Sequence, residues 1–362
     1  MRSVIDVVDL SVKELNDLIK TATDIIKRPK KYANAMKGKK LATLFFEPST
    51  RTRLSFESAM LELGGQVIGV SDASSSSSAK GESIADTAKV VSCYADVIAM
   101  RSPTEGAAYV ASKNAEVPVI NAGDGGHCHP TQTLADLLTI YRKKGTFDNL
   151  TIGFCGDLKY GRTVHSLLNA MARYSNVKVV LISPKELKIP DYVKSETLLK
   201  ANMEYVETED LESAIPSLDV LYMTRIQQER FDDQDEYERL KNSYVLTVEK
   251  LQNAKEDMCI MHPLPRVNEI SVNVDEDSRA CYFEQVKNGK FMRMALILML
   301  VKDAKANKQK EERALKGLRV DKKHRCANPK CAFNVERELE SLVFEDEKEG
   351  VLRCAYCEKE VK

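Results

Sequence analysis

Several segments of the sequence combine basic and hydroxyl side chains in a way suited to binding anions. The first is Ser49-Thr50-Arg51-Thr52-Arg53, which follows an apolar run and precedes a helical pattern. A helix start offers unpaired N–H groups, hydroxyls donate further hydrogen bonds, and arginine can bind two oxygens of a phosphate or carboxylate at once. The plain alternative is a serine cap followed by surface arginines.

Four further apolar runs are each followed by a group that can bind an oxyanion. These groups are Arg101, His129, Arg162 and Arg225. Carboxyl ends of strands line the ligand crevice in open α/β sheets, so these side chains should converge on a ligand rich in negative charge. A lone histidine is more often a packed or surface residue, but His129 opens a helical pattern that also carries Gln132, which favours a hydrogen-bond donor at a reacting group.

Four of the nine cysteines form a separate pattern near the end of the chain. Cys326-x4-Cys331 is followed after 22 residues by Cys354-x2-Cys357. Two cysteine pairs at this spacing are typical of a tetrahedral four-thiolate zinc site, and four thiolates leave no open position for water. We therefore expect structural Zn²⁺, the alternative being four free thiols.

Alternating helical and strand patterns must position these groups. Helices are expected at 11–35, 51–63, 83–94, 131–143, 162–175 and 291–306, and strands at 40–46, 66–70, 96–101, 117–121, 150–155, 178–182, 220–223 and 258–261. Such alternation predicts parallel sheets with helices on both faces. The predicted fold class is α/β, with two parallel-sheet α/β domains, an interdomain cleft and a small C-terminal β-rich zinc module.

The domain boundaries follow from composition and pattern. We expect a first α/β domain at residues 1–140 completed by a helix at 286–306, a second at 141–285, a basic connector at 307–325 and the four-cysteine domain at 326–362. Residues 302–325 carry ten Lys or Arg and four Asp or Glu. A solvated tether is the plain interpretation of this segment, and a nucleic-acid-binding arm is the alternative.

Charge and hydropathy exclude some classes of protein. Lys+Arg and Asp+Glu both number 54, so the whole chain has no surplus of positive charge for gripping nucleic acid or an anionic membrane. The longest apolar run, 294–301, is far too short to span a bilayer, and the first residues lack an uninterrupted apolar segment typical of export signals. We expect a cytoplasmic protein.

Seven separated motifs in one order resemble a known family. The motifs are FFEPSTRTR, a serine-rich loop ending in KGES, MRSP, HPTQT, GDLKYGRTVHSL, TRIQQER and HPLPR. Together they resemble the catalytic chain of the aspartate carbamoyltransferases over residues 1–306. The related ornithine carbamoyltransferases share the STRTR and HPxQ elements, whereas TRIQQER and HPLPR favour a dicarboxylate amino acid as second substrate.

The resemblance implies a role for each matching residue. The phosphate of carbamoyl phosphate would be held by Ser49, Thr50, Arg51 and Thr52. The carbonyl oxygen would be contacted by Arg51, Thr52, Arg101 and His129. The carbamoyl NH₂ would be bound by Gln132 and by the backbone carbonyls of Leu264 and Pro265. The carboxylates of L-aspartate would be bound by Arg162, Thr163, Arg225 and Gln227.

The resemblance also implies an assembly. Lys80 and Ser76 would reach into the site of a neighbouring subunit, which makes the active unit a homotrimer; Ser77 fits almost as well as Ser76. The implied reaction, a step of pyrimidine synthesis, uses no metal or organic cofactor.

The cysteine segment resembles the zinc domain of the regulatory chain of bacterial aspartate carbamoyltransferases. The matching residues are CANPKC and CAYCEKE, and no nucleotide-binding domain precedes them. This departure makes nucleotide feedback through the chain doubtful and favours a role in subunit contacts. The rival from another class is a zinc-ribbon nucleic-acid-binding or regulatory protein, although the tail lacks an interleaved aromatic and basic face.

Overall fold

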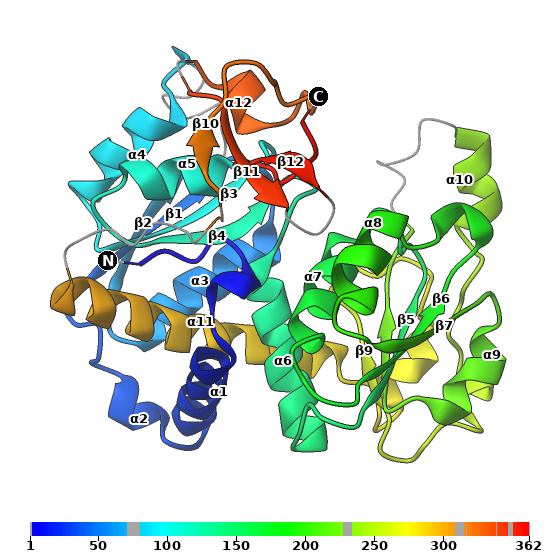
Figure 1. Cartoon of the computed structure of the whole chain (residues 1–362). Coiled ribbons are helices and arrows are strands. Elements are labelled where there is room, and N and C mark those ends of the chain that lie inside the picture. Colours follow the sequence, from blue (N-terminus) through cyan, green and yellow to red (C-terminus); the bar gives the residue numbers. More distant parts are fainter. Residues whose placement is uncertain are drawn as a thin grey trace. The chain divides into compact units, whose positions relative to one another are not determined.

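The computed structural model describes residues 2–70, 80–226, 234–307, 315, 317–337, 339–346 and 350–361 (Figure 1). The chain divides into two compact units. Unit 1 comprises Met1–Thr131 and Lys290–Lys362, and unit 2 comprises Gln132–Gly289. The domain limits at residues 140 and 285 stay a prediction.

Unit 1 is built on a parallel sheet of four strands in the order β2-β1-β3-β4. The strands are β1 (Lys40–Phe45), β2 (Gln66–Val70), β3 (Val97–Ser102) and β4 (Val119–Asp124). The helices between them are α3 (Thr50–Glu62), α4 (Ile84–Ser92) and α5 (Ala107–Asn114). Strands β3 and β4 are buried at every position because helices cover both faces, which confirms the predicted parallel α/β architecture.

The first and the last helix predicted for the two sheet domains differ in length from the prediction. The helix expected over residues 11–35 ends earlier, as α1 (Val12–Lys27), because Pro29 lacks an N–H and opens a separate short helix, α2 (Pro29–Tyr32). Ser11 and Glu14 form the capping box that starts α1. The helix expected from residue 291 begins earlier, as α11 (Tyr282–Ala306), because its first turns are polar and lie in unit 2.

Unit 2 contains a second parallel sheet, with the order β7-β6-β5-β8-β9. The strands are β5 (Thr151–Cys155), β6 (Lys178–Ile182), β7 (Glu204–Thr208), β8 (Val220–Met223) and β9 (Cys259–Met261). The helices include most of α6 (Pro130–Lys144), α7 (Arg162–Met171), α8 (Asp191–Val193), α9 (Leu211–Ala214) and α10 (Gln234–Leu240). The prediction omitted β7, an edge strand with no fully buried residue.

The cysteine segment folds into a small antiparallel module within unit 1, as predicted. Its strands are β10 (Arg319–Val320), β11 (Leu342–Asp346) and β12 (Val351–Cys354), with one helical turn, α12 (Ala332–Val335). Figure 1 shows this module, in orange and red, beside α4 and α5. Val343 and Tyr356 of the module share one apolar cluster with Ile5 and Tyr109, so the module packs on the first sheet domain of its own chain.

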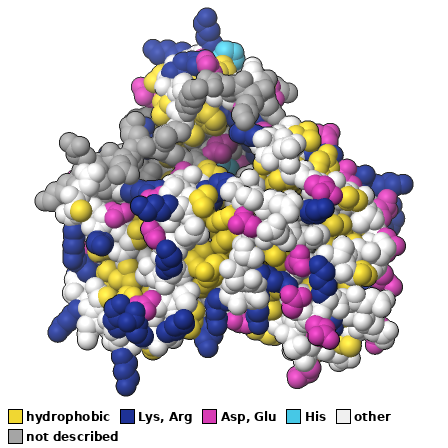
Figure 2. All heavy atoms as spheres, turned by 60° about the horizontal axis from the view of Figure 1, so that its bottom comes forward, with side chains coloured by type: hydrophobic (Ala, Val, Ile, Leu, Met, Phe, Trp, Pro, Cys, Tyr) yellow, Lys and Arg dark blue, Asp and Glu magenta, His cyan; other side chains and the backbone are white. Residues whose placement is uncertain are grey.

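Acidic and basic side chains share the surface, and no described helix is long and apolar enough for a membrane span. Figure 2 shows acidic as well as basic side chains across the face it presents, with hydrophobic side chains between them. Within the described residues, every helix is too short or too polar to cross a bilayer.

Candidate functional site

The first anion-binding segment lies where β1 leads into α3. Ser49 is the N-cap residue of this 13-residue helix, and its side chain makes no capping hydrogen bond. Thr50 and Arg51 are exposed in the first turn, whereas Thr52 is buried. The N-terminal N–H groups, the serine hydroxyl and the Arg51 guanidinium therefore lie in one turn, as an anion site requires.

Arg101 and His129 come together beside Gly123. Arg101 lies at a register shift between β3 and β4, a place where strands commonly re-aim a side chain. A Cβ at Gly123 would lie 2.7 Å from Nη1 of Arg101 and 3.4 Å from Cδ2 of His129. Both side chains are almost fully buried, so Gly123, with φ +117°, lets them pack against the backbone.

Glu47 forms part of this arrangement and was not among the predicted site residues. Its Oε2 lies 2.8 Å from Nη2 of Arg101. The arginine also donates from Nη1 to the carbonyl of Ala122 at 3.3 Å. Glu47 belongs to the FFEPSTRTR motif, and this position in the motif was the available signal.

Arg293 is a second residue that sequence reasoning missed, because it appeared only as an interruption of an apolar helix. It is buried, and its guanidinium stacks over Phe56 at 5.2 Å. Nη1 donates to Ser55 Oγ at 3.0 Å and Nη2 donates to Thr131 Oγ1 at 3.2 Å. Arg293 thus ties α11 to the helix that carries Arg51 and to the residue two positions after His129.

In unit 2, Arg162 and Arg225 follow the neighbouring strands β5 and β8. The two loops are joined because the Asp157 N–H donates to Thr224 Oγ1 at 2.9 Å. Asp157 also accepts the Tyr160 N–H at 2.9 Å, which shapes the turn before Arg162. The structure therefore brings Arg162 and Arg225 to the same edge of this sheet, both part-buried.

Gln132 and Thr163 are anchored by buried polar groups of unit 2. Gln132 Nε2 donates to Asp136 Oδ1 at 2.8 Å. The Thr163 side chain lies close enough to Tyr222 to act against the rise in its pKa, and the Tyr222 hydroxyl donates to Asp136 Oδ2 at 3.0 Å. Gln132 therefore bonds to the Asp136 carboxylate directly, whereas Thr163 lies next to a residue that does.

The HPLPR loop is fixed by its histidine. His262 Nε2 donates to Glu269 Oε1 at 2.7 Å, and the Leu264 N–H donates to His262 Nδ1 at 2.8 Å. Burial would raise the pKa of Glu269, but the hydrogen bond and charge of His262 outweigh it, so the pKa is lowered. Leu264 and Pro265 are partly or fully exposed on a rigidly held loop.

The structure does not describe every predicted site residue. Ser76, its alternative Ser77 and Gln227 lie outside the described residues. Lys80 is described, and it is exposed where the serine-rich segment ends.

The four cysteines come together as a buried cluster. Their sulfur atoms all lie within 4.8 Å of one another, with 3.5 Å between the sulfurs of Cys326 and Cys357 and 3.6 Å between those of Cys331 and Cys354. A tetrahedron with Zn–S bonds of about 2.3 Å has edges of about 3.8 Å, so the cluster fits one such ion with little adjustment.

The cysteine module is bound to its own chain by polar contacts around Glu105. The Glu105 carboxylate accepts a hydrogen bond from Asn328 Nδ2 at 2.7 Å and lies 3.0 Å from Lys359 Nζ. Its backbone N–H donates to Lys330 O at 2.8 Å, and its carbonyl accepts the Ala332 N–H at 2.8 Å. Glu105 therefore holds the module through both its side chain and its main chain.

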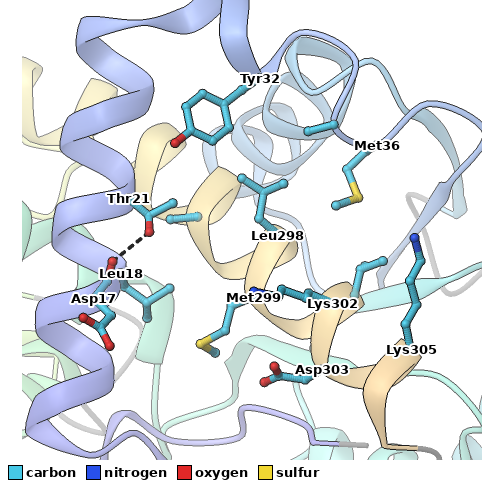
Figure 3. A pocket seen from close by; sticks show the side chains of 13 residues that line it. Asp17, Leu18, Thr21, Tyr32, Met36, Leu298, Met299, Lys302, Asp303 and Lys305 are labelled. Atoms are coloured by element: carbon cyan, nitrogen blue, oxygen red, sulfur yellow. Dashed lines mark hydrogen bonds between the residues drawn. The ribbon is translucent and has the colours of Figure 1, made fainter.

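Unit 1 also contains a cavity of about 530 Å³ between α1, α2 and α11 (Figure 3). Tyr32, Met36, Leu298 and Met299 line it, together with charged groups such as Asp303. The described lining includes none of the predicted site residues.

Comparison with protein families divides the chain into three matches. Residues 2–142 match the model "Aspartate/ornithine carbamoyltransferase, carbamoyl-P binding domain" and residues 148–300 match its "Asp/Orn binding domain". Residues 319–362 match the "Aspartate carbamoyltransferase regulatory chain, metal binding domain".

Individual relatives are similar over most of their length. The aspartate carbamoyltransferase catalytic subunit of Clostridium novyi is 64% identical over 296 residues, which is 82% of this chain and 96% of that protein. Among solved structures, the catalytic subunit of M. jannaschii aspartate transcarbamoylase has 47% identity and a TM-score of 0.79, covering 85% of this chain and all of that chain. The Trypanosoma cruzi enzyme in complex with N-(phosphonacetyl)-L-aspartic acid has 38% identity and a TM-score of 0.77, covering 83% and 95%.

Proposed function

The chain belongs to the aspartate/ornithine carbamoyltransferase family, and from this premise we propose that it transfers the carbamoyl group of carbamoyl phosphate to L-aspartate. The products are N-carbamoyl-L-aspartate and phosphate, as in de novo pyrimidine synthesis. The observation that carries the proposal is the presence of anion-binding groups at the carboxyl ends of strands in both sheets, in a chain 64% identical over 296 residues to an aspartate carbamoyltransferase catalytic subunit.

The first substrate is a small dianion, which suits the start of α3. Ser49, Thr50, Arg51 and Thr52 supply hydroxyls, N–H groups and a guanidinium for the phosphate. Arg101 and His129, packed together beside Gly123, extend this set of donors toward the carbonyl oxygen. Since Glu47 pairs with Arg101, it holds that guanidinium in place.

The reaction needs charge stabilisation more than proton chemistry. The uncharged aspartate amine forms a C–N bond to the carbamoyl carbon, the C–O bond to phosphate breaks, and the departing phosphate takes the amine proton. Negative charge develops on the carbonyl oxygen, where Arg51, Thr52, Arg101 and His129 donate. One such donor contributes about 3 kcal/mol to transition-state stabilisation, and orientation of the two substrates supplies much of the rest.

The second substrate carries two carboxylates. Arg162 and Arg225 at one sheet edge, with Thr163 and Gln227, provide the matching charge and hydrogen bonds. Gln132 and the carbonyls of Leu264 and Pro265 would accept from the carbamoyl NH₂.

We assign the four-cysteine cluster to one structural Zn²⁺. Four buried thiolates suit Zn²⁺ and leave no position for a reacting water. The ion would stabilise the module and take no part in the transfer. None of the nine cysteines, all of which lie in the described part of the chain, forms a disulfide, which supports the cytoplasm, a reducing compartment, as the location.

A homotrimer is the assembly we propose, with Lys80 and Ser76 serving a neighbouring site. Edge strand β2 has no fully buried residue, and large apolar side chains are exposed on it and on or just after the flanking helices. These are Leu54, Leu61, Ile68, Val90 and Tyr94. An exposed strand edge with apolar neighbours is typical of a protein interface.

The proposed reaction is tested with the purified protein and carbamoyl phosphate. Phosphate release should be fast with L-aspartate, and the organic product should be N-carbamoyl-L-aspartate. Faster release with ornithine would assign the chain to ornithine carbamoyltransferase instead. Salt-sensitive binding to DNA or RNA without turnover would favour the zinc-ribbon alternative.

The shared site is tested by mixing variants. Arg51→Ala and Lys80→Ala trimers should each be inactive, and mixed trimers should regain activity because some sites combine an intact Arg51 with an intact Lys80. Absence of any recovery after verified subunit exchange would contradict a shared site.

A further inference from the structure

One buried carboxylate in unit 2 accepts hydrogen bonds from side chains of three separate elements, α6, β8 and α11. Asp136 lies on α6 with no exposed surface. Its Oδ1 accepts hydrogen bonds from Gln132 Nε2 at 2.8 Å and Gln285 Nε2 at 2.6 Å, and its Oδ2 accepts from the Tyr222 hydroxyl at 3.0 Å. Burying a carboxylate is costly unless such bonds satisfy it, so this cluster of donors calls for an explanation.

The donor and acceptor groups of the neighbouring residues determine which atom donates in each of these hydrogen bonds. Gln285 Oε1 accepts the His262 backbone N–H at 3.0 Å, which turns its NH₂ toward Asp136. Burial, followed by the charge of Asp136, raises the pKa of Tyr222, so its hydroxyl keeps its proton and donates. All three hydrogen bonds run toward the oxygens of Asp136, and the Gln132 atom that faces them is Nε2 of its NH₂ group.

Fixing the amide of Gln132 leaves its carbonyl oxygen turned away from Asp136. A carbonyl oxygen accepts hydrogen bonds, and the carbamoyl group differs from an acetyl group by having NH₂, a donor, where acetyl has a methyl. A freely turning amide would present NH₂ about as readily as oxygen and would oppose the donor of the substrate.

We propose that Asp136 is a positioning residue that locks the Gln132 amide with its oxygen toward the substrate, and so makes the site select a carbamoyl over an acetyl group. This inference rests on the proposed function, because it takes the Gln132 ligand role from it. Through Gln285 and the His262 N–H, the same carboxylate also connects to the loop of Leu264 and Pro265. One side chain thereby links the acceptors proposed for the carbamoyl NH₂.

The test uses a matched pair of unreactive analogues. Phosphonoacetamide carries the NH₂ and acetonylphosphonate carries a methyl in its place, and each is measured as a competitive inhibitor against carbamoyl phosphate. The ratio of their inhibition constants reports selection for NH₂, while inorganic phosphate reports the phosphate contacts alone. The wild-type protein should prefer phosphonoacetamide.

Two variants remove the carboxylate in different ways. Asp136→Ala leaves a space and Asp136→Leu fills it, so at least one should fold well enough to measure. The preference for the amide should fall by about tenfold or more, the scale at which supporting hydrogen bonds affect ligand geometry. Inhibition by inorganic phosphate should stay within about twofold of wild type, because the phosphate contacts lie in other motifs.

Conservative and matched variants complete the experiment. Asp136→Asn keeps one acceptor oxygen and should recover part of the preference, and Asp136→Ala should add little to the loss in Gln132→Met, because both act through one interaction. Asp219 supports the opposite end of the sheet by accepting the Thr151 N–H at 2.7 Å. Asp219→Ala should lower stability and leave the preference unchanged.

Different results would contradict the positioning role of Asp136 and the proposed carbamoyl transfer. If a folded Asp136→Ala or Asp136→Leu protein prefers phosphonoacetamide over acetonylphosphonate as strongly as the wild type does, the positioning role is wrong, whatever the turnover rate of that variant. Absence of carbamoyl transfer by the wild-type protein would instead overturn the proposed function.

Discussion

Glu105 and Asn328 are hydrogen-bonded at 2.7 Å although 223 residues separate them in the chain. This bond joins the start of α5 to the cysteine module. The same carboxylate accepts the Gly126 N–H at 3.3 Å, only three residues before His129. The attachment of the module is thus adjacent in structure to the loop that leads into the proposed site.

Glu105→Ala should weaken this attachment. It leaves Asn328 and Lys359 without their acceptor, at a cost of about 1–3 kcal/mol for a buried polar group. Trypsin should release the cysteine module faster, and the urea midpoint should fall. Glu116→Ala, which changes an exposed glutamate in the same domain, is the control. Equal trypsin resistance in the two variants would show that Glu105 does not hold the module.

Removal of the metal should unfold the cysteine module and leave the two sheet domains folded. A structural four-thiolate site contributes its binding energy to folding. Metal analysis should give one zinc per chain, falling to near zero in Cys354→Ser and unchanged in Cys93→Ser, which alters an exposed thiol outside the cluster. Loss of turnover in a metal-free protein that remains trimeric would contradict a purely structural ion.

Arg51→Ala should abolish most turnover without unfolding the protein. Arg51 is exposed in the first turn of α3, so the fold does not depend on it, whereas loss of a transition-state donor costs about 10²–10³ in kcat. Arg53→Ala is the matched control, because Arg53 forms an ion pair with Glu57 at 2.7 Å on the same helix. Steady-state rates for both, at equal thermal midpoints, test the assignment. Wild-type kcat in Arg51→Ala would remove it.

Arg225→Ala should chiefly raise the KM for aspartate. A charged hydrogen bond of about 1.5–3 kcal/mol corresponds to a rise of roughly 10- to 100-fold. The KM for carbamoyl phosphate should stay near the wild-type value, since its phosphate ligands are in other motifs. An unchanged aspartate KM would place the second substrate elsewhere.

Glu269→Gln should destabilise the protein at neutral pH by about 1–3 kcal/mol, because Glu269 is buried and accepts from His262 and two backbone N–H groups. The folded-state pKa of Glu269 lies below its ordinary value of 4.5. The carboxylate therefore stabilises the fold above that value, and the stability is lost as the pH falls through the lower, folded-state pKa.

Urea unfolding across this pH range should show that the difference in stability between the wild-type protein and Glu269→Gln becomes smaller as the pH falls. A difference that is independent of pH would contradict the assignment. Glu276→Gln, at an exposed position, should show no such trend.

Much of the architecture could be predicted because apolar runs and helix signals are local. β2 and β6 have the predicted limits, since both are short apolar segments bounded by polar residues. β7 was missed because Glu204, Glu207 and its edge position give it no apolar run. α11 begins before its apolar stretch because packing in unit 2 extends it.

The sequence could predict those site residues whose function is indicated by the motif in which they lie. Arg101 and His129 were named from strand ends, and they do pack together beside Gly123. The supporting residues Glu47, Arg293 and Asp136 were not, because their meaning lies in partners distant in sequence. Periodicity indicates which face of a helix is buried, and says nothing of which polar groups meet there.

The junction between Glu105 and the cysteine module has a consequence for stoichiometry. Since both partners belong to one polypeptide, their encounter is intramolecular, and a covalent connection gives it a high effective concentration that bulk dilution cannot lower. Two separate chains at low abundance would dissociate, whereas here every catalytic chain carries its own cysteine module in a fixed one-to-one ratio, however scarce the protein becomes.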